Sequence, residues 1–398
     1  MKNFLQGICY FLFKCVMGIY VTIFQHVRFN KNKIKLPRKQ PVLFLSNHHT
    51  NWDPVYLNVM FFSRNIHFIA NEELFENKFF HFIFKTCLGN IKRSSNKSDV
   101  SDVIDILRLK KEGHNIGIYP EGDIDMFGRI INRNIAISKL AKKLSMPIVL
   151  LSLKGAHLRA PRWSKLPHHS KINYNLNRLI SLEEIKSMSI EELDKAIWDG
   201  ISVDEMKTQK ESRIRQFGPS RAKWLELGLF LCPKCGKYET MHSKRNVLYC
   251  SKCGFKVKLN KYSFFEFTKS KDKPPFVTTA EWNDYQINDL EKRIESVNDD
   301  PILEKEGLKL FAANYNDKFD KKDYKDASLS IFKDKIELKI EDFIKTFNVN
   351  DIIDCSLIHK DVLEICLPDG RYRFEYDDEK WPAYLYVQCI NKIRESGD

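Results

Sequence analysis

Short apolar runs alternate with stretches of helical spacing through the first half of the chain. Four of these runs have the length of a buried strand and end at polar or turn-forming residues. Between them, apolar residues recur at every third or fourth position, which predicts helices. Strands that alternate with helices indicate an α/β sheet with parallel pairing and a site beyond the carboxyl ends of its strands. The predicted strands are residues 41–46, 66–70, 115–119 and 147–153, and the predicted helices lie at 100–107 and 134–145.

The second half of the chain has a different pattern. Residues 180–228 are polar with helical spacing, and residues 280–315 also indicate helix. From about residue 327, apolar and polar positions alternate between turn signals, as in strands with one solvated face. We expect a small antiparallel barrel or sandwich, which a final helix at residues 381–393 caps. The expected strands are residues 328–332, 336–340, 362–366 and 372–376.

The N-terminal segment from Phe4 to Val27 carries a single fixed charge, Lys14. About 24 helical residues reach about 36 Å, close to the ~30 Å hydrocarbon thickness of a bilayer. Lys14 near the middle argues against a comfortable span, although its side chain can snorkel. We therefore favour an embedded or re-entrant anchor over a true span, and a soluble core helix comes third. A signal peptide fits poorly, because no small-residue cleavage site follows.

Charge points to the same end of the chain. The 398 residues include 65 Lys and Arg against 52 Asp and Glu, a net charge of +13, which favours an anionic membrane surface or nucleic acid as partner. Residues 1–165 alone hold 26 basic and 11 acidic residues, so the whole excess lies there. The apolar content of 43% excludes wholesale disorder, and a single long apolar stretch excludes a polytopic membrane protein. A basic cluster without acids follows the apolar segment: Arg28, Lys31, Lys33, Lys35, Arg38 and Lys39.

The first candidate for chemistry follows the strand at 41–46. His48 and Asp53 lie five positions apart in Asn47-His-His-Thr-Asn-Trp-Asp-Pro54. Across a turn into a helix, this spacing lets the carboxylate bond to the imidazole, fix its tautomer and raise its basicity. Such a histidine can take a proton from an alcohol without a serine or cysteine nucleophile. Ordinary capping residues in a strand-to-helix turn are the alternative.

Two further blocks follow this motif in the sequence and are expected at the same site. Lys92 and Arg93, which follow Gly89-Asn90-Ile91, can hold a phosphate, although a solvated surface pair is the simpler interpretation. Glu121 and Gly122 end the strand at 115–119 in Tyr-Pro-Glu-Gly-Asp123. The glycine allows a tight turn, and the glutamate can accept hydrogen bonds from a polyol. A plain β-turn is the alternative.

Taken in order, the blocks NHxxxxDP, GxIxR and PEG, followed by Pro147-Ile-Val-Leu150, resemble the four motif blocks of the glycerolipid acyltransferase family. This resemblance covers about residues 40–160. It implies an αβ sandwich at a membrane face and acyl transfer from acyl-CoA or acyl carrier protein to a glycerolipid hydroxyl. It further implies that His48 is the general base and that Asp53 orients it. The residues expected to bind substrate are Asn47, Lys92, Arg93, Glu121 and Gly122.

The third block departs from the family pattern. Members commonly continue PEG with a small hydroxyl residue, arginine and serine, whereas this chain continues with Asp123-Ile124-Asp125. The missing arginine helps to hold an anionic acceptor, and two carboxylates in its place would repel a phosphate. Arg129 is a possible substitute. We therefore expect either a phosphorylated lyso-glycerolipid or an uncharged or cationic acceptor such as a lyso-glycolipid.

A cysteine module lies between the two halves. Cys232, Cys235, Cys250 and Cys253 form C-x2-C-x14-C-x2-C with a glycine after each pair, which is the spacing of a closed four-thiolate zinc site. The module resembles a zinc ribbon, and because a closed site has no open position we assign it a structural role. A pair of disulfides is the alternative, which the predicted cytoplasmic setting disfavours. The ribbon is locally basic, so nucleic acid stays a less favoured partner.

These observations predict an O-acyltransferase of phospholipid synthesis at the cytoplasmic face of the cell membrane. Its partners are membrane lipids and the acyl donor, and its oligomeric state is left open. A non-catalytic membrane or nucleic-acid scaffold is the alternative. The expected segments are an anchor with its basic cluster (1–39), the acyltransferase α/β domain (40–180), a helical connector (181–228), the zinc ribbon (229–262), a linker with helices (263–326), and a β-rich domain with a C-terminal helix (327–398) that is similar in outline to pleckstrin-homology-like barrels.

Overall fold

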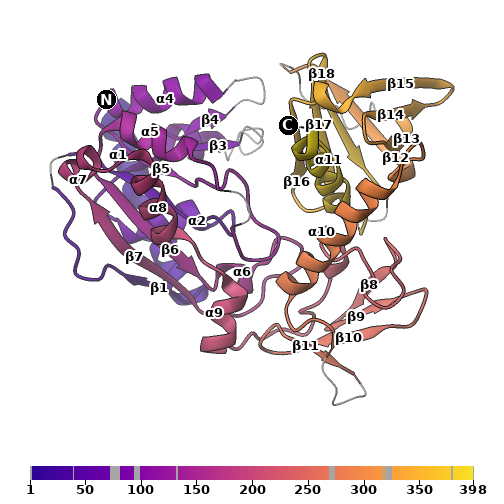
Figure 1. The fold of residues 1–398 in the computed structure, drawn as a ribbon. Coiled ribbons are helices and arrows are strands. Elements are labelled where there is room, and N and C mark those ends of the chain that lie inside the picture. Colours follow the sequence, from indigo (N-terminus) through magenta and orange to yellow (C-terminus); the bar gives the residue numbers. More distant parts are fainter. Residues whose placement is uncertain are drawn as a thin grey trace. The chain divides into compact units, whose positions relative to one another are not determined.

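The computed structural model divides into two compact units, which are described separately (Figure 1). The N-terminal unit consists of Met1–Pro161 and Pro167–Phe217, and the C-terminal unit of Arg162–Leu166 and Gly218–Asp398. The structure describes residues 2–38, 40–71, 81–93, 99–130, 133–268, 274–315, 317, 319, 325–377 and 380–397.

The N-terminal unit is built on a seven-stranded sheet with the order β1-β7-β6-β2-β5-β3-β4. All neighbouring strands run parallel except β6 and β7, which are antiparallel. The sequence predicted β2, β3, β5 and β6, and the structure confirms them. The strands are β1 (Val27–Asn30), β2 (Leu43–Ser46), β3 (Ile66–Asn71), β4 (Ile91–Arg93), β5 (Asn115–Ile118), β6 (Ile148–Lys154) and β7 (Ile172–Ile180).

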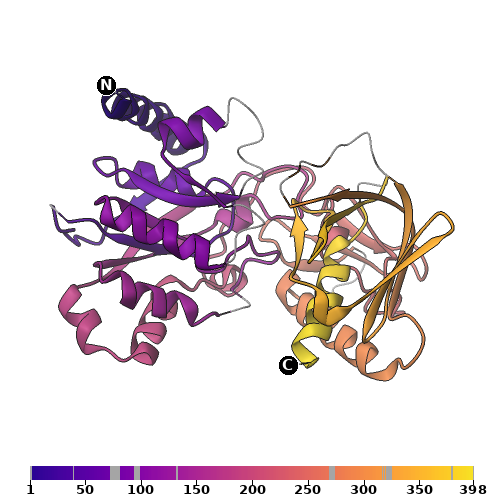
Figure 2. The same ribbon diagram turned by 90° about the horizontal axis from the view of Figure 1, so that it is seen from above.

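Helices cover both faces of this sheet, so its central strands are buried throughout (Figure 2). In β2, Leu43 and Leu45 join one core, whereas Phe44 points into the other, as the two-residue period of a strand requires. This explains why β2 is continuously apolar rather than alternating. The N-terminal unit is therefore an α/β sandwich, as predicted. One face carries α4 (Asp99–Lys111), α5 (Ala136–Leu144) and α8 (Ile190–Ile201), and the other carries α2 (Asp53–Met60).

The polar stretch after β7 folds into short helices, as the sequence predicted. Ser181 and Ser189 each form a capping box with the glutamate three residues later, which satisfies the first backbone N–H groups of α7 and α8. β7 itself was missed. The remaining helices of this unit are α6 (Ala156–Arg159), α7 (Leu182–Ser187) and α9 (Glu205–Ser212).

The apolar N-terminal segment forms α1 (Lys2–Ile19), which continues into the π-helical turn η1 (Tyr20–Phe24). Among the described residues, one helical window, Gly7–Phe24, is long and apolar enough to cross a membrane, with a mean hydropathy of 1.8. Core helices and signal sequences can share this length and composition. Only 17% of the window is buried within the protein, so most of its apolar side chains face outward.

The inward side of α1 is fixed by two polar side chains. The Tyr10 hydroxyl accepts a hydrogen bond from the backbone N–H of Ile66 at 2.8 Å. The ammonium of Lys14, a residue only 1% exposed, donates to the backbone carbonyls of Phe62 (3.0 Å) and Arg64. The charge that looked costly in the middle of an apolar helix is therefore turned into the protein.

The C-terminal unit begins with the cysteine module, a four-stranded antiparallel sheet in the order β11-β10-β9-β8, followed by a long helix. Its helix, α10, begins at a capping box formed by Thr278 and Glu281. The elements are η4 (Leu225–Leu227), β8 (Met241–Lys244), β9 (Val247–Cys250), β10 (Lys256–Leu259), β11 (Phe265–Phe267) and α10 (Thr279–Ser296).

A seven-stranded antiparallel sheet follows, in the order β15-β14-β13-β12-β18-β17-β16. The C-terminal helix α11 (Ala383–Gly397) packs against β16 and β17. The predicted strands and final helix are confirmed in this β-rich region. The strands are β12 (Leu303–Ala313), β13 (Lys325–Ile331), β14 (Lys335–Ile340), β15 (Phe343–Asn348), β16 (Asp354–Ile358), β17 (Val362–Leu367) and β18 (Gly370–Glu375).

The helix predicted over residues 280–315 is wrong in its second part. α10 ends at Ser296, and β12 then pairs with both β13 and β18. The register of β12 shifts between Lys305 and Leu308, around Gly307, whose φ is 69°. This bulge interrupts the two-residue alternation that marks a strand in the sequence.

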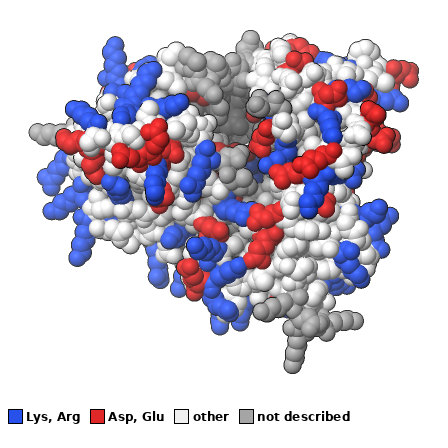
Figure 3. Space-filling model, viewed as in Figure 1, with Lys and Arg blue, Asp and Glu red and all other residues white. Residues whose placement is uncertain are grey.

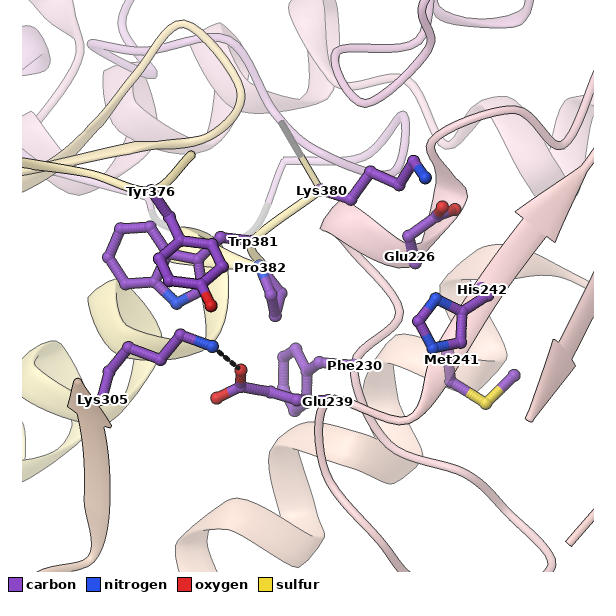
Figure 4. A pocket seen from close by; sticks show the side chains of 10 residues that line it. All are labelled: Glu226, Phe230, Glu239, Met241, His242, Lys305, Tyr376, Lys380, Trp381 and Pro382. Carbon is purple, nitrogen blue, oxygen red and sulfur yellow. Dashed lines mark hydrogen bonds and ion pairs between the residues drawn. The ribbon is translucent and has the colours of Figure 1, made fainter. Parts of the chain in front are cut away.

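Polar contacts join the cysteine module to this sheet (Figure 4). Glu239 of the module accepts from the ammonium of Lys305 on β12 at 3.1 Å and from the hydroxyl of Tyr386 on α11 at 2.6 Å. The Lys305 ammonium also lies 4.3 Å from the centroid of the Tyr376 ring. A pocket of about 90 Å³ opens beside these side chains, with Trp381 on its wall. The module and the β-rich sheet thus share a polar interface within one unit.

Replacement of Lys14 by methionine should weaken the attachment of α1. Burying the carbonyls of Phe62 and Arg64 without a donor costs about 1–3 kcal/mol, so we expect the free energy of unfolding to fall by about that amount. Chemical denaturation of the protein in detergent micelles measures it. The matched control is Lys139→Met, which removes an exposed lysine from α5. Equal stability of the two variants would show that Lys14 does not hold α1.

Candidate active site

The predicted pair of His48 and Asp53 meets at the carboxyl end of β2. The chain leaves β2 at Ser46 and enters α2 at Asp53, so the loop between them folds back on itself. His48 Nδ1 lies 2.8 Å from Asp53 Oδ2, and the side chain of His48 is 18% exposed while that of Asp53 is fully buried. Because Nδ1 is engaged by the carboxylate, Nε2 is the nitrogen that can take a proton.

Asp53 holds the loop as well as the histidine. Its Oδ2 also accepts from the backbone N–H groups of His49 (2.7 Å) and Thr50 (2.9 Å), and its Oδ1 accepts from the Thr50 hydroxyl at 2.7 Å. Several hydrogen bonds to one buried carboxylate leave it little freedom to move. The loop is therefore built around the group that orients His48.

Aromatic packing fixes the plane of the imidazole. The ring of His48 stacks on that of Tyr119 with centroids 4.3 Å apart and an interplanar angle of 19°. Tyr119 in turn stacks on Phe68 of β3 at 5.7 Å. Burial raises the pKa of the Tyr119 hydroxyl well above its ordinary value, so this ring is a neutral platform. His48 can thus rotate little about its side-chain bonds.

Glu121 lies next to His48, after β5. Its Oε1 accepts a hydrogen bond from the backbone N–H of His48 at 2.7 Å. Burial raises the pKa of the Glu121 carboxyl to about 8, so it is largely protonated at neutral pH. Gly122 follows with a φ of 77°, in the left-handed region that favours glycine, and its N–H closes the turn onto Tyr119 O at 3.1 Å. The predicted glutamate and glycine therefore lie beside the predicted base, with Glu121 attached to its backbone.

Asn47 lies on the inner side of the same loop. Its side chain accepts from the N–H of Leu153 at 2.7 Å and donates to the carbonyl of Leu153 at 2.9 Å, which ties the loop to β6. The residue is fully buried. These bonds give Asn47 a structural part in positioning the loop, and its contact with substrate stays a prediction.

Lys92 and Arg93 form the end of β4. Their backbone pairs in parallel with Ala70 and Asn71 of β3. β3 also pairs with β5, the strand that leads into Glu121. The side chains of Lys92 and Arg93 lie outside the described part of the structure.

A buried polar cluster behind His48 was not expected from the sequence. His49 Nδ1 lies 2.6 Å from Asp125 Oδ2, and His49 Nε2 lies 2.8 Å from the Asn47 amide nitrogen. Burial alone would lower the pKa of His49, but the charge of Asp125 and its hydrogen bond to Nδ1 raise that pKa to about 10. The Asp125 carboxylate also accepts from the backbone N–H of Arg129 at 3.1 Å. The second histidine thus connects the loop after β2 to the loop after β5.

This cluster corrects the expectation for Asp125. Its side chain is 6% exposed and turned into the protein, where it pairs with His49 instead of facing an acceptor. Burial alone would raise the pKa of Asp125, but its interactions with His49 and the backbone hold it below the ordinary value. Asp123 differs, because it is exposed and its carboxylate accepts from the N–H of Ile124 at 2.7 Å. Any repulsion of a phosphate therefore comes from Asp123.

Glu205 completes the cluster from α9. Its Oε1 accepts from the N–H of Gly155, just after β6, at 2.5 Å and lies 3.8 Å from His49 Nε2. The N–H of Glu205 itself donates to the carbonyl of Gly128 at 2.8 Å. Burial raises the pKa of this carboxyl to about 7. No sequence signal marked Glu205, which lies in the segment expected to be a connector.

The four predicted metal ligands come together in the C-terminal unit. Their sulfurs all lie within 4.8 Å of one another, with Cys232 and Cys253 3.6 Å apart and Cys235 and Cys250 3.8 Å apart. A tetrahedral zinc with Zn–S bonds of about 2.3 Å places its sulfurs about 3.8 Å apart, so the donor set fits. Gly236, with a φ of 62°, allows one of the turns. The cluster could hold a metal ion.

Comparison with known proteins adds independent observations. Residues 27–154 match the family model described as Acyltransferase. A curated relative, the 1-acyl-sn-glycerol-3-phosphate acyltransferase of Streptococcus pneumoniae, is 25% identical over 167 residues, which is 41% of this chain. The match spans 59% of the length of that relative.

Solved structures give weaker likenesses. The LPA acyltransferase of Thermotoga maritima covers 53% of this chain and 98% of its own, with 15% identity and a TM-score of 0.39. Inner Membrane Complex Sub-compartment Protein 3 of Toxoplasma gondii covers 29% of this chain and 87% of its own, with 13% identity and a TM-score of 0.19. The segment that matches the family model, residues 27–154, lies within the N-terminal unit and contains His48, Asp53 and Glu121.

Proposed function

We propose that the N-terminal unit transfers a fatty acyl group from acyl-CoA or acyl carrier protein to the hydroxyl of a lyso-glycerolipid, in phospholipid synthesis. The observation that carries this proposal is the hydrogen bond of 2.8 Å between His48 and Asp53 at the carboxyl edge of a mostly parallel sheet. It lies inside the segment that matches the acyltransferase family. The active sites of α/β enzymes commonly lie at the carboxyl ends of the strands of such a sheet.

The proposed reaction needs one base and no covalent enzyme intermediate. His48 Nε2 takes the proton of the acceptor hydroxyl while the oxygen attacks the thioester carbonyl of the donor. The tetrahedral intermediate then expels the thiolate, which receives that proton from His48, and an ester has replaced the thioester. Asp53 stabilises the imidazolium that forms in between. Protonated Glu121 can donate a hydrogen bond from Oε2, an atom that has no partner among the described residues.

We propose a 1-acylglycerol-3-phosphate-like acceptor, with an unphosphorylated lyso-glycerolipid as the second candidate. The withdrawal of Asp125 into the pair with His49 removes one of the two charges that argued against a phosphate. Lys92 and Arg93 at the end of β4 are the proposed partners of that phosphate. The exposed carboxylate of Asp123 is the observation that favours the uncharged acceptor.

We propose a location at the cytoplasmic face of the membrane, and the exposed apolar side chains of α1 and η1 support the contact with a membrane. The ring of Tyr20 lies 5.3 Å from that of Trp52, the residue before Asp53, and the ring of Phe11 lies 5.6 Å from that of Phe62. The apolar surface therefore reaches the loop that carries His48. Large exposed apolar patches mark membrane or partner contacts. The side chains that are at least 39% exposed include Ile8, Phe11, Leu12, Val16, Ile19, Tyr20, Ile23, Phe24 and Phe62.

The four cysteines of the C-terminal unit are proposed to hold a structural zinc ion. A closed set of four thiolates leaves no open position for a substrate, and a bound ion would stabilise the turns at both cysteine pairs. A non-catalytic scaffold that uses this unit to bind a partner or nucleic acid is the competing function. It predicts no change in membrane lipids when the protein is deleted.

Replacement of the catalytic pair tests the activity. His48→Ala should lower kcat by about 10²–10⁴-fold, because a positioned general base contributes about that much, and Asp53→Asn should also be strongly impaired. The assay follows acyl transfer from acyl-CoA and from acyl carrier protein to phosphorylated and unphosphorylated lysolipids. His169→Ala, which removes an exposed histidine of the same unit, is the matched control. Full activity of His48→Ala would overturn the mechanism.

The buried carboxyl groups predict a loss of stability as pH rises. The pKa of Glu121 is raised to about 8 and that of Glu205 to about 7, so the folded protein keeps protons that the unfolded chain releases near pH 4.5. The stabilising contribution of the protonated Glu121 and Glu205 carboxyls is complete below about pH 4.5. It is lost as the pH rises through about 8. Unfolding in urea between pH 5.5 and 8.5 should show a shallower decline for Glu121→Gln than for the wild type. The exposed-residue control, Glu211→Gln, should decline like the wild type, and identical slopes for all three would contradict the prediction.

Metal analysis tests the cysteine cluster. The purified protein should contain one zinc ion per chain, and Cys235→Ser should contain much less, while Cys15→Ser outside the cluster keeps it. Removal of zinc by a chelator should lower the unfolding temperature, because a structural metal contributes folding energy. A metal-free protein with oxidised cysteines would instead support the disulfide alternative.

A further inference from the structure

A groove of about 650 Å³ lies in the N-terminal unit, at the edge of the sheet opposite His48. Three turns form it, at residues 31–38 and 40–41 before β2, 61–65 before β3, and 113–114 before β5, together with the first residue of β5, Asn115. Because these strands are parallel, the turns before them share one edge of the sheet, and the loops that carry His48 and Glu121 share the other. The groove is therefore separate from the proposed active site.

The charge of the groove is positive. Among the described residues that line it, Lys31, Arg38, Arg64 and His114 are basic or can become charged, and none is acidic. An exposed carboxylate does lie close by, since His114 Nε2 is 3.5 Å from Glu112 Oε2. Figure 3 shows lysine and arginine side chains projecting along the left-hand edge of the N-terminal unit. An anion is the ligand that this lining fits.

Hydrogen bonds of Arg64 give the groove a defined shape. Its guanidinium donates to the carbonyl of Pro37, to the carbonyl of Gln40 at 3.3 Å and to the side-chain oxygen of Asn115 at 3.0 Å. One side chain thus ties together all three turns. The guanidinium of Arg64 is engaged in these hydrogen bonds. Lys31 and Arg38 are both exposed and are the cations that can bind a ligand.

Apolar side chains share the groove with these cations. Ile34, Leu36 and Phe61 line it, and the ammonium of Lys31 lies 5.3 Å from the centroid of the Phe61 ring. A wall of this kind suits a ligand with both an anionic group and an apolar part. A fully hydrated ion such as free phosphate would gain nothing from it.

The groove also adjoins the exposed apolar surface of α1. Lys14 of α1 donates to the carbonyls of Phe62 and Arg64, so the turn at 61–65 supports the helix on one side and lines the groove on the other. Phe62 is 42% exposed and contacts Phe11, which is 56% exposed. An apolar surface that enters lipid would bring the groove to the level of the headgroups.

We propose that this groove is a second, non-catalytic lipid site that binds the phosphate of an anionic phospholipid headgroup in the bilayer. Lys31 and Arg38 contact the phosphate, and the half-buried side chains of Ile34 and Leu36 contact the glycerol and the start of the acyl chains. The site holds the N-terminal unit on anionic membrane through a contact that is independent of acyl transfer. It accounts for the basic cluster that follows the apolar segment in the sequence.

Binding of the full-length protein to vesicles tests the proposal without requiring activity. The quantity to measure is the ratio of affinities for phosphatidylcholine vesicles with and without a minor fraction of phosphatidylglycerol, since α1 contributes to both. Lys31→Gln with Arg38→Gln should lower this ratio by about 30-fold, because each charge near an anionic surface contributes about 1 kcal/mol. The matched control, Lys139→Gln with Lys143→Gln, removes two exposed lysines of α5 and should lower it less than about 5-fold.

The outcomes separate the possible ligands. Equal losses in the two double variants would overturn the proposal, because binding would then depend only on net charge. Inhibition of vesicle binding by millimolar glycerol phosphate, lost in the Lys31/Arg38 variant, would overturn it in favour of a soluble phosphate compound. Acyl transfer to a lysolipid dispersed in detergent should be unchanged in both double variants, which shows that they are folded. Vesicle binding without any acyl transfer in the wild type would leave this site standing and refute the proposed function.

Discussion

The conformation of the loop that carries His48 depends on the buried carboxylate of Asp53. A charge without exposure to water is costly unless hydrogen bonds compensate it, and here the imidazole of His48, two backbone N–H groups and the hydroxyl of Thr50 do so. All of these donors come from residues 48–50. The carboxylate therefore obtains its hydrogen bonds only when these residues adopt the folded loop conformation. His48 is positioned as a result, with Tyr119 behind its ring. If this loop changed conformation, the His48 imidazole would lose its orientation and the Asp53 carboxylate would lose its hydrogen bonds.

A second layer of buried polar contacts supports this loop. Asn47 connects it to β6, and the pair of His49 and Asp125 connects it to the loop after β5. Glu205 then links the cluster to the turn after β6. The departure from the family pattern at Asp125 thus has a physical explanation, because an aspartate at this position has a histidine at hydrogen-bond distance. His49 and Asp125 form one buried pair, and the proposed acceptor site loses a negative charge that the sequence alone would assign to it.

The sequence predicted the parts of the fold that are set by local pattern. β2, β3, β5 and β6 are largely apolar because both faces of the sheet are covered, and this pattern is visible without the structure. The His48–Asp53 contact spans five residues and follows from one turn. The His49–Asp125 contact spans 76 residues and needs β2 and β5 to be neighbours, which is a property of strand order and not of either segment. β12 was missed because the bulge at Gly307 breaks the alternation that identifies a strand. Glu205 carried no local signal, since its partners come from β6 and the loop after β5.

The position of Lys14 changes how the N-terminal helix is understood. In the sequence, a lysine inside an apolar segment weakens the case for a membrane contact, because a charge in hydrocarbon is expensive. In the structure this lysine is bound to backbone carbonyls at the turn before β3, whereas Ile8, Phe11, Leu12, Val16 and Ile19 of α1 are apolar and exposed. The charge then fixes which side of the helix faces the protein. It also sets the rotation of α1, so that Phe11 meets Phe62 near the groove and Tyr20 of η1 meets Trp52 near His48. A single apolar surface therefore extends from the amino ends to the carboxyl ends of the parallel strands. A membrane that contacts this surface would reach both His48 and the groove that contains Lys31 and Arg38.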